Sequence, residues 1–270
     1  SVLGGLELPA GMQFTSDMKK AGEKQDAIVL ATASVYTRGV ARELHPYVKS
    51  GQLLVCVAKG IEEKSLLFQT DEVQEEIPDA VVACLSGPSH AEEVARRLPT
   101  TCVAGAADSA VAEQVQELFM NRVFRVYTST DVKGIELGGA VKNVIALAAG
   151  IADGLGYGDN TKAALITRGI AETARLGVKL GAHWETFAGL TGIGDLIVTC
   201  ASMHSRNRRA GILIGQGKPV EEAMREVGQV VEGVYSAKAA LALAEREQVE
   251  MPIVDVVNRV LFSELPAAEA

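Results

Sequence analysis

The chain has 270 residues, of which 48% are hydrophobic and 22% are charged, and its formal net charge is −8. This composition allows one large domain or two modest ones and excludes a disordered chain, because enough apolar surface is available to offset the entropy of folding. The 27 glycines have no regular period, which excludes a collagen-like repeat. An acidic chain binds nucleic acids and anionic membranes poorly, so we expect neither as a partner.

The cysteines and histidines are scattered, so we expect neither disulfides nor a metal centre. Three of the four cysteines fall in strand-like apolar runs, which predicts buried free thiols in a reducing compartment and hence a cytoplasmic protein; the four are Cys56, Cys84, Cys102 and Cys200. The uncharged stretch at 143–152 is shorter than the roughly 20 residues of a membrane span. No secretion signal opens the chain, so we expect no membrane span and no export.

The first half of the chain alternates strand-like and helix-like segments. Strand-like apolar runs lie at 26–34, 52–57, 80–85, 100–104 and 124–127, with helical spacing of apolar residues between them. This alternation predicts an α/β domain over residues 1–130, in which helices cover both faces of a parallel sheet. Ser89 and Glu92 have the spacing of a capping box, so we expect a helix from Ser89 to Leu98.

From residue 131 onward only helical patterns occur. Helices are expected at 131–154, 160–180, 194–200, 205–214, 220–227, 234–246 and 252–262. Gly181 would end the second of them and Pro252 would begin the last. The sequence therefore predicts an all-helical domain over residues 131–270, following the α/β domain. Its long apolar first helix could be the core of this domain or a dimer seam.

Lys142 stands in the most apolar of these helices. Between Leu137 and Ala152 only Lys142 and Asn143 are polar, and a helix that is apolar all round is buried. No carboxylate lies three or four residues from Lys142, so we expect desolvation to lower its pKa and to suit it for proton exchange with an alcohol or carbonyl oxygen. The alternatives are a side chain that reaches the surface, or one that pairs with an acid from elsewhere in the fold.

Two positions that directly follow strand-like runs are candidate ligand sites, because parallel sheets bind ligands at the carboxyl ends of their strands. Lys59 follows the second run. The turn Ser86-Gly87-Pro88-Ser89 follows the third, where Gly87 permits close approach of the backbone and the next helix offers amide donors. The structural alternatives are a solvated lysine and a plain turn with Ser89 as a helix cap.

Residues 205–209 read SRNRR and bring three guanidinium groups together in an acidic protein. Arginine suits phosphate oxygens, and three such groups repel one another unless an anion or carboxylates offset their charge. We therefore expect a phosphate-bearing small molecule here, with a solvated basic helix face as the alternative. Asp195 follows a glycine-rich stretch and could cap the next helix, orient Lys142 or bind a substrate hydroxyl.

Five segments together resemble NAD(P)-dependent glycerol-3-phosphate dehydrogenases of the bacterial type. They are LSGPSHAEEVARRLPT (85–100), GIELGGAVKNVIALAAGIADGLGYGDNTKAALITRG (134–169), GIGDLIVTC (192–200), SRNRRAGILIGQG (205–217) and GQVVEGVYSAKA (228–239). The resemblance covers nearly the whole chain, from VLGGLELP onward. It implies a partial Rossmann-like sheet domain, a helical substrate domain and a homodimer. The implied reaction is reduction of dihydroxyacetone phosphate by NADH or NADPH to sn-glycerol 3-phosphate, which supplies the glycerophospholipid backbone.

The resemblance also implies roles for single residues. Lys142 would be the catalytic general acid and base. The residues that would bind substrate are Lys59, Gly87, Ser89, Lys142, Asp195, Ser205, Arg206 and Asn207. The residues that would bind the dinucleotide are Lys59, Ala91, Arg206, Val230 and Glu232.

The chain departs from this family near its start. It has no GxGxxG motif after a strand, and the family's first two strands and the helix between them are absent. Residues 31–34 read ATAS where the family usually has a proline-containing turn, so a nicotinamide contact of Ser34 stays open. We expect a longer protein, of which roughly the first 50 residues (about one βαβ unit) precede this chain. The alternatives are a non-catalytic fragment that binds a phosphate ester or dimerises, and a dehydrogenase of another hydroxyacid.

Overall fold

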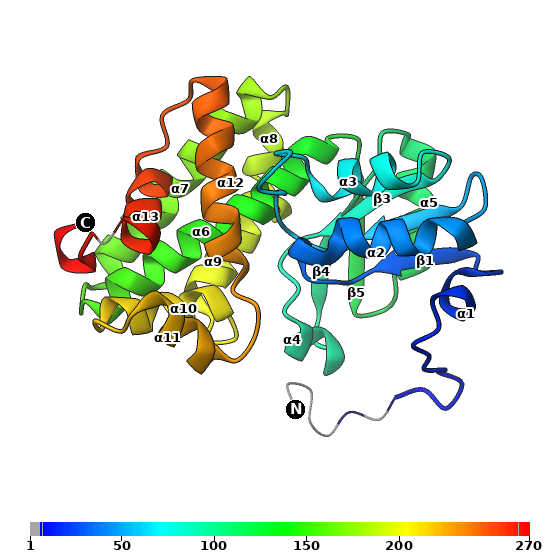
Figure 1. Ribbon diagram of the computed structural model, residues 1–270, viewed down its shortest axis with the longest axis horizontal. Helices are drawn as coiled ribbons and strands as arrows, with labels where there is room; N and C mark the ends of the chain where they lie inside the picture. Colours follow the sequence, from blue (N-terminus) through cyan, green and yellow to red (C-terminus); the bar gives the residue numbers. More distant parts are fainter. Residues whose placement is uncertain (1–5, 7, 264) are drawn as a thin grey trace.

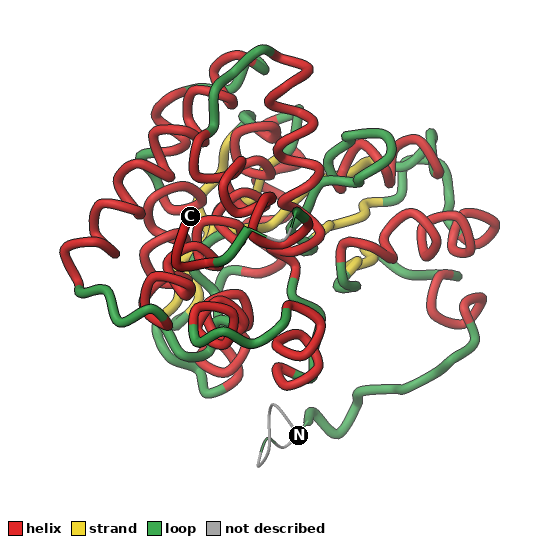
Figure 2. The backbone as a smooth tube through the Cα atoms, turned by 60° about the vertical axis from the view of Figure 1, so that its left-hand side comes forward, coloured by secondary structure: helices red, strands yellow, loops and turns green. Residues whose placement is uncertain are grey.

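The computed structural model describes residues 6, 8–263 and 265–270. A five-stranded sheet with its helices occupies one side of the molecule, and a cluster of helices occupies the other (Figure 1). Residues 8–17 form an exposed loop that runs away from the body in both views (Figures 1 and 2). Most of VLGGLELP, at 2–5 and 7, lies outside the described residues, so its resemblance has no structural counterpart here.

The sheet has its strands in the order in which they occur along the chain. They are β1 (Ala27–Leu30), β2 (Leu53–Cys56), β3 (Val81–Ser86), β4 (Thr100–Gly105) and β5 (Phe124–Ser129). The neighbouring strands are parallel except β3 and β4, which are antiparallel, with Leu85 opposite Ala104. The prediction of a parallel sheet is wrong at this one pair. The helix between these strands, α4 (Ala91–Ala95), has 5 residues. It rises only about 7.5 Å, too little to carry the chain back along a strand of about 20 Å.

Helices cover both faces of the sheet, as predicted. The helices α2 (Thr37–Leu44) and α3 (Gln69–Glu76) pack on one face, where Leu54 belongs to their core cluster. The helix α5 (Ser109–Phe119) packs on the other face with Leu53 and Val55. All four cysteines are buried free thiols, as predicted. The short helix α1 (Met18–Gly22) precedes the sheet and was not predicted.

The chain after β5 is helical, and the predicted α/β-then-helical architecture is confirmed. Its helices are α6 (Val132–Gly154), α7 (Asp159–Lys179), α8 (Trp184–Phe187), α9 (Asp195–Ala201), α10 (Arg206–Gly215), α11 (Val220–Val227), α12 (Glu232–Glu247) and α13 (Pro252–Phe262). Gly181, with a φ of 90°, follows α7, and Pro252 begins α13, as expected. The division into domains at residue 130 stays a prediction.

The helix α6 is the core of the helical part. It is long and apolar enough to cross a membrane by length and composition, but 94% of its apolar window is buried inside this chain. The helices α7, α9, α10 and α12 pack around it. Of the two roles left open for this helix, the domain core is therefore the one observed.

Glycines set the distance between α6 and α10. A Cβ atom on Gly150 would lie 2.2 Å from the carbonyl oxygen of Arg208, and a Cβ atom on Gly211 would lie 2.2 Å from that of Leu147. Only glycine at both positions allows the two backbones to approach this closely. The contact holds the first turn of α10, with its arginines, near the middle of α6, where Lys142 stands.

Candidate active site

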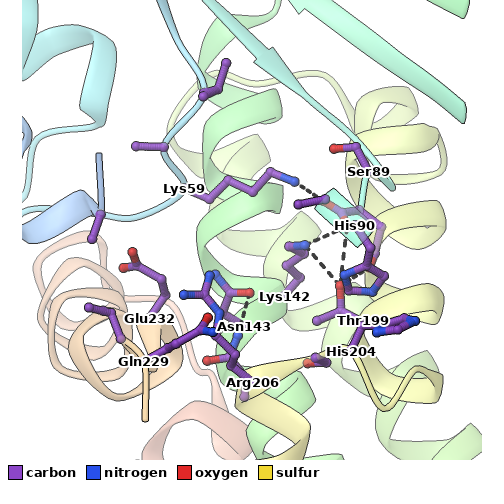
Figure 3. Close-up of a pocket in the computed structure, with 18 of the residues that line it drawn as sticks. Lys59, Ser89, His90, Lys142, Asn143, Thr199, His204, Arg206, Gln229 and Glu232 are labelled. Atoms are coloured by element: carbon purple, nitrogen blue, oxygen red, sulfur yellow. Dashed lines mark hydrogen bonds and ion pairs between the residues drawn. The ribbon is translucent and has the colours of Figure 1, made fainter. Parts of the chain in front are cut away.

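A cavity of about 600 Å³ lies where the sheet edge meets the helical part. Its walls come from the ends of β1 and β2, the turn around the start of α4, the middle of α6, the starts of α9 and α10, and the loop before α12. In Figure 3, Lys142 lies in the middle of this wall, with His90 and Thr199 to one side and Arg206 and Glu232 to the other. The carboxyl ends of two parallel strands therefore share this cavity with residues from five helices, α4, α6, α9, α10 and α12.

Lys142 is buried and faces an acid from another helix. Its side chain is 8% exposed, and Nζ lies 2.6 Å from Oδ1 of Asp195 and 3.0 Å from the hydroxyl oxygen of Thr199. The expected burial is confirmed, and the lysine does not reach the surface. The alternative of an acid partner from elsewhere in the fold is also correct, because Asp195 lies 53 residues further along the chain.

Lys59 shares the same carboxylate. Its Nζ lies 2.8 Å from Oδ2 of Asp195 and donates to the carbonyl oxygen of Gly87 at 2.9 Å. Asp195 therefore holds two ammonium groups, one on each oxygen, and is itself buried. Helix capping by Asp195, one of the three roles considered for it, is wrong, because it is the first residue of α9 and its side chain caps no helix.

A close backbone contact puts Asp195 opposite Lys142. The irregular turn η3 (Leu190–Gly194) precedes α9 and lies against α6. A Cβ atom on Gly138 would lie 2.6 Å from the carbonyl oxygen of Thr191, so any side chain there would push this turn away. Gly138 thus allows the start of α9 to approach α6 one turn before Lys142.

Burial and the neighbouring charges together set the pKa values of this cluster. Burial lowers the pKa of Lys142 to about 8, with the attraction of Asp195 opposing the shift and the repulsion of Lys59 adding to it. Burial alone would raise the pKa of Asp195, but the two ammonium groups outweigh it and hold that pKa below its ordinary value. The site therefore carries an ionised carboxylate beside an amine that exchanges its proton near neutral pH.

The turn at 86–89 is built differently from the predicted cap. The hydroxyl of Ser89 donates to the carbonyl oxygen of Gly87 at 3.1 Å, and the N-cap of α4 is His90, which makes no side-chain capping bond. The predicted capping box of Ser89 and Glu92 is therefore wrong, and the helix ends at Ala95 rather than Leu98. Gly87 has a φ of 147°, which favours glycine, and its carbonyl joins this turn to Lys59.

The first turn of α10 presents polar groups to the cavity. Ser205 is its N-cap and accepts from the amide of Arg208 at 3.2 Å. Asn207 donates to Oδ1 of Asn143 at 2.9 Å and accepts from the amide of Gly233 at 2.8 Å, so it joins α10 to α6 and α12. A helix N-terminus has free amide donors and a favourable dipole for anions.

The three arginines of the SRNRR run have two different surroundings. Arg208 lies 2.7 Å from Asp153 and is absent from the cavity wall among the described residues. Arg206 and Arg209 both line the cavity. The predicted repulsion is therefore relieved by a carboxylate for one arginine, while the other two face the cavity.

Glu232 joins the two parts of the molecule across the cavity. It is the first residue of α12 and accepts from the amide of Ser34 at 3.1 Å and from its hydroxyl. The cavity wall contains every predicted site residue except Gly87, namely Lys59, Ser89, Ala91, Lys142, Asp195, Ser205, Arg206, Asn207, Val230 and Glu232. Gly87 contacts the site through Lys59, and the roles of all these residues stay predictions.

Sequence reasoning missed several residues of the cavity wall. Thr199 lies one turn after Asp195 on α9 and contacts the same lysine, a spacing that could have indicated it. Asn143 was noted only as a polar neighbour of Lys142. His90 and His204, whose ring centres are 5.9 Å apart, come from two loops and carried no signal in the sequence.

Comparisons with known proteins found related sequences along nearly the whole chain. The family models described as NAD-dependent glycerol-3-phosphate dehydrogenase N-terminus and C-terminus match residues 1–112 and 131–270. The glycerol-3-phosphate dehydrogenase (NAD(P)+) of Agathobacter rectalis is 64% identical over 268 residues, 99% of this chain and 80% of that protein. The corresponding Bacillus subtilis protein is 51% identical over 264 residues, 97% of this chain and 76% of that protein.

A solved structure is similar along nearly the whole chain. The crystal structure of glycerol-3-phosphate dehydrogenase from Coxiella burnetii superposes with a TM-score of 0.95 at 36% identity. The match covers 99% of this chain and 82% of that chain.

Proposed function

Since the chain belongs to the NAD-dependent glycerol-3-phosphate dehydrogenase family, we propose that the cavity is its active site. The reaction is the interconversion of dihydroxyacetone phosphate and sn-glycerol 3-phosphate with NADH or NADPH, which supplies the glycerophospholipid backbone. One observation carries the assignment of the site. Lys142, a buried amine paired with Asp195, shares the cavity wall with the guanidinium of Arg206 and the N-terminus of α10.

The strand ends fit a nicotinamide dinucleotide. The wall at the end of β1 carries Ala31 and Ala33, and the wall after β2 carries Ala58, so small side chains leave room for a planar ring. Arg206, Val230 and Glu232 would contact the cofactor from the helical part of the molecule, and Ala91 would contact it from the start of α4 beside the sheet. When bound, NAD(P)H supplies the hydride that the ketone carbon accepts.

Lys142 donates and accepts the proton of the reaction. As an ammonium it donates a proton to the carbonyl oxygen as negative charge develops there, and in the reverse direction the neutral amine accepts the proton of the alcohol. Its pKa of about 8 keeps both forms accessible near neutral pH. Asp195 and Thr199 hold Nζ in place, and Lys59 brings a second positive charge beside the same carboxylate.

The start of α10 holds the phosphate. The guanidinium of Arg206 and the backbone amides of Arg206 and Asn207, which precede the amide that Ser205 caps, are suited to phosphate oxygens. Asn207 fixes this turn against α6 through Asn143. Binding of the phosphate thus positions the carbonyl group of the same molecule next to Lys142, so that remote binding energy lowers the barrier.

The test is turnover of the full-length gene product. NADH or NADPH oxidation, followed by absorbance, should be rapid with dihydroxyacetone phosphate and slow with dihydroxyacetone and with 2-keto acids, which lack the phosphate. Faster turnover of a 2-keto acid would point to another dehydrogenase. If fluorescence titration shows that neither NADH nor NADPH binds, the protein is a non-catalytic phosphate-ester binder and the proposal fails.

The family resemblance further supports a homodimer located in the cytoplasm, acting on a small phosphate ester. Light scattering coupled to size-exclusion chromatography measures the mass of the assembly directly. A mass equal to that of a single chain would contradict the homodimer, and recovery of the protein in the membrane or exported fraction would contradict the location.

A further inference from the structure

Arg209 is a positively charged residue of the cavity wall to which neither the mechanism nor the family resemblance gives a role. It lies one turn after Arg206 on α10, so the two guanidinium groups start from the same face of the helix. Both line the cavity, whereas Arg208 between them is turned toward Asp153, to which it is bound at 2.7 Å. The SRNRR run thus divides into one arginine with a structural partner and two directed at the cavity.

The acids of the cavity do not neutralise this pair. Within the described part of the chain, neither Arg206 nor Arg209 has a carboxylate oxygen within 4.0 Å. Asp195 forms ion pairs with two lysines, and Glu232 forms its hydrogen bonds with Ser34 rather than with either arginine. Glu92, the remaining acid of the wall, pairs with neither arginine.

Arg209 also has an unsatisfied donor. Its Nε is inaccessible to solvent and has no hydrogen-bond partner among the described residues. A buried N–H without a partner destabilises a protein, and a charged one more than a neutral one. A small turn of the guanidinium toward the cavity, where an anion could accept from its Nε and Nη edge, would remove this cost.

We propose that Arg209 is a second phosphate-binding residue of the active site, acting with Arg206 on the phosphate group of the substrate. This inference rests on the proposed function and adds the residue that completes its anion site. A phosphate ester carries a charge between about −1.5 and −2 at neutral pH, so one guanidinium leaves part of it unpaired. Two arginine forks neutralise it and fix its orientation.

The test compares Arg209→Met with wild type on substrates with and without a phosphate. Loss of a charged hydrogen bond predicts a KM for dihydroxyacetone phosphate that rises about 10- to 100-fold. The kcat/KM for dihydroxyacetone should change less than about twofold, because that substrate has no phosphate to bind. A KM for dihydroxyacetone phosphate within about twofold of wild type overturns the inference.

Cofactor titrations show whether Arg209 binds the phosphate of the substrate or a phosphate of the cofactor. The Kd of NADH and of NADPH should stay within about twofold of wild type in Arg209→Met. If these constants rise while the KM for dihydroxyacetone phosphate does not, Arg209 binds a cofactor phosphate and the inference is wrong. Failure of the proposed function is a different result, since wild type itself would then not reduce dihydroxyacetone phosphate.

Two further variants control for structure. Arg208→Met removes the neighbouring guanidinium with its ion pair to Asp153, and should lower thermal stability without raising the KM for dihydroxyacetone phosphate. If both methionine variants raise this KM equally, the effect comes from distortion of α10 and the inference fails. Should Arg209→Met not fold, Arg209→Lys decides, since it keeps the charge but loses the fork and should raise the KM by a smaller factor.

Discussion

The helix α6 buries two titratable side chains in contrasting surroundings. Near its start, Glu136 accepts from the amide of Thr70 at 3.1 Å and from its hydroxyl, and no cation lies within 4.0 Å of it among the described residues. Two turns later, Lys142 lies against Asp195 and lines the cavity. Glu136 joins α6 to α3 and is absent from the cavity wall as described.

The comparison separates burial from function. Burial raises the pKa of Glu136 to about 7 and lowers that of Lys142 to about 8, so desolvation moves both toward neutrality from opposite sides. A perturbed pKa alone therefore does not distinguish a catalytic group from a structural one. What distinguishes Lys142 from Glu136 is its access to the cavity and the neighbouring charge of Asp195, which keeps its ammonium form populated.

Removal of Lys142 should have the largest effect. We expect Lys142→Ala to lower kcat for dihydroxyacetone phosphate at least about 100-fold, because the general acid of the reaction is lost. Initial rates of NADH oxidation at saturating substrate measure this. The matched control on the same helix is Glu136→Gln, for which kcat should stay within about twofold of wild type. Near-normal turnover by Lys142→Ala would refute the assigned role.

Glu136 should instead control how stability depends on pH. Its pKa is about 7 in the folded protein against an ordinary value of 4.5, so between these pH values the folded state holds a proton that the unfolded state has lost. Stability contributed by this group is therefore present below about pH 4.5 and falls as pH rises toward 7. Between about pH 5 and 7.5 the loss is on the order of 2 kcal/mol.

Chemical unfolding at the two pH values tests this expectation. Glu136→Gln cannot ionise, so the difference in unfolding free energy between wild type and variant should change by that amount in favour of the variant as pH rises. A difference that is the same at both pH values would show that Glu136 does not titrate in this range.

Much of the fold could be predicted because its signals are local. The nearly uninterrupted apolar run predicts a helix over 131–154, which the structure has as α6 (Val132–Gly154), and Pro252 and Gly181 mark helix ends through their own backbone preferences. The direction of β4 could not be predicted, because it depends on how far the short helix α4 carries the chain. The capping box predicted at Ser89 is wrong because the conformation of the preceding turn lets the Ser89 hydroxyl donate to the carbonyl oxygen of Gly87 instead.

In the candidate site too, local features could be predicted from the sequence, whereas contacts between distant parts of the chain could not. The burial of Lys142 could be predicted because the helix around it is apolar on all sides and offers no carboxylate within one turn. Its partner could not be chosen from sequence alone, since the approach of Asp195 depends on the contact at Gly138, from a turn 53 residues further along. The different surroundings of Arg208 and Arg209 likewise depend on Asp153, which lies on α6, 55 residues before Arg208 in the chain.

The smallest expected effect concerns the counter-charge of Lys142. Asp195 raises the pKa of this lysine against the effect of burial, so Asp195→Asn should lower that pKa below about 8. Reduction of the ketone needs the ammonium form, hence its rate falls as pH rises through this pKa. In the variant, the falling limb of the kcat profile should lie at least about one pH unit lower, the shift expected from loss of an adjacent opposite charge. Thr199→Val removes a hydrogen bond to the same Nζ but no charge, so its limb should move less. Equal shifts in the two variants would mean that hydrogen bonding, rather than the charge of Asp195, sets the protonation of Lys142.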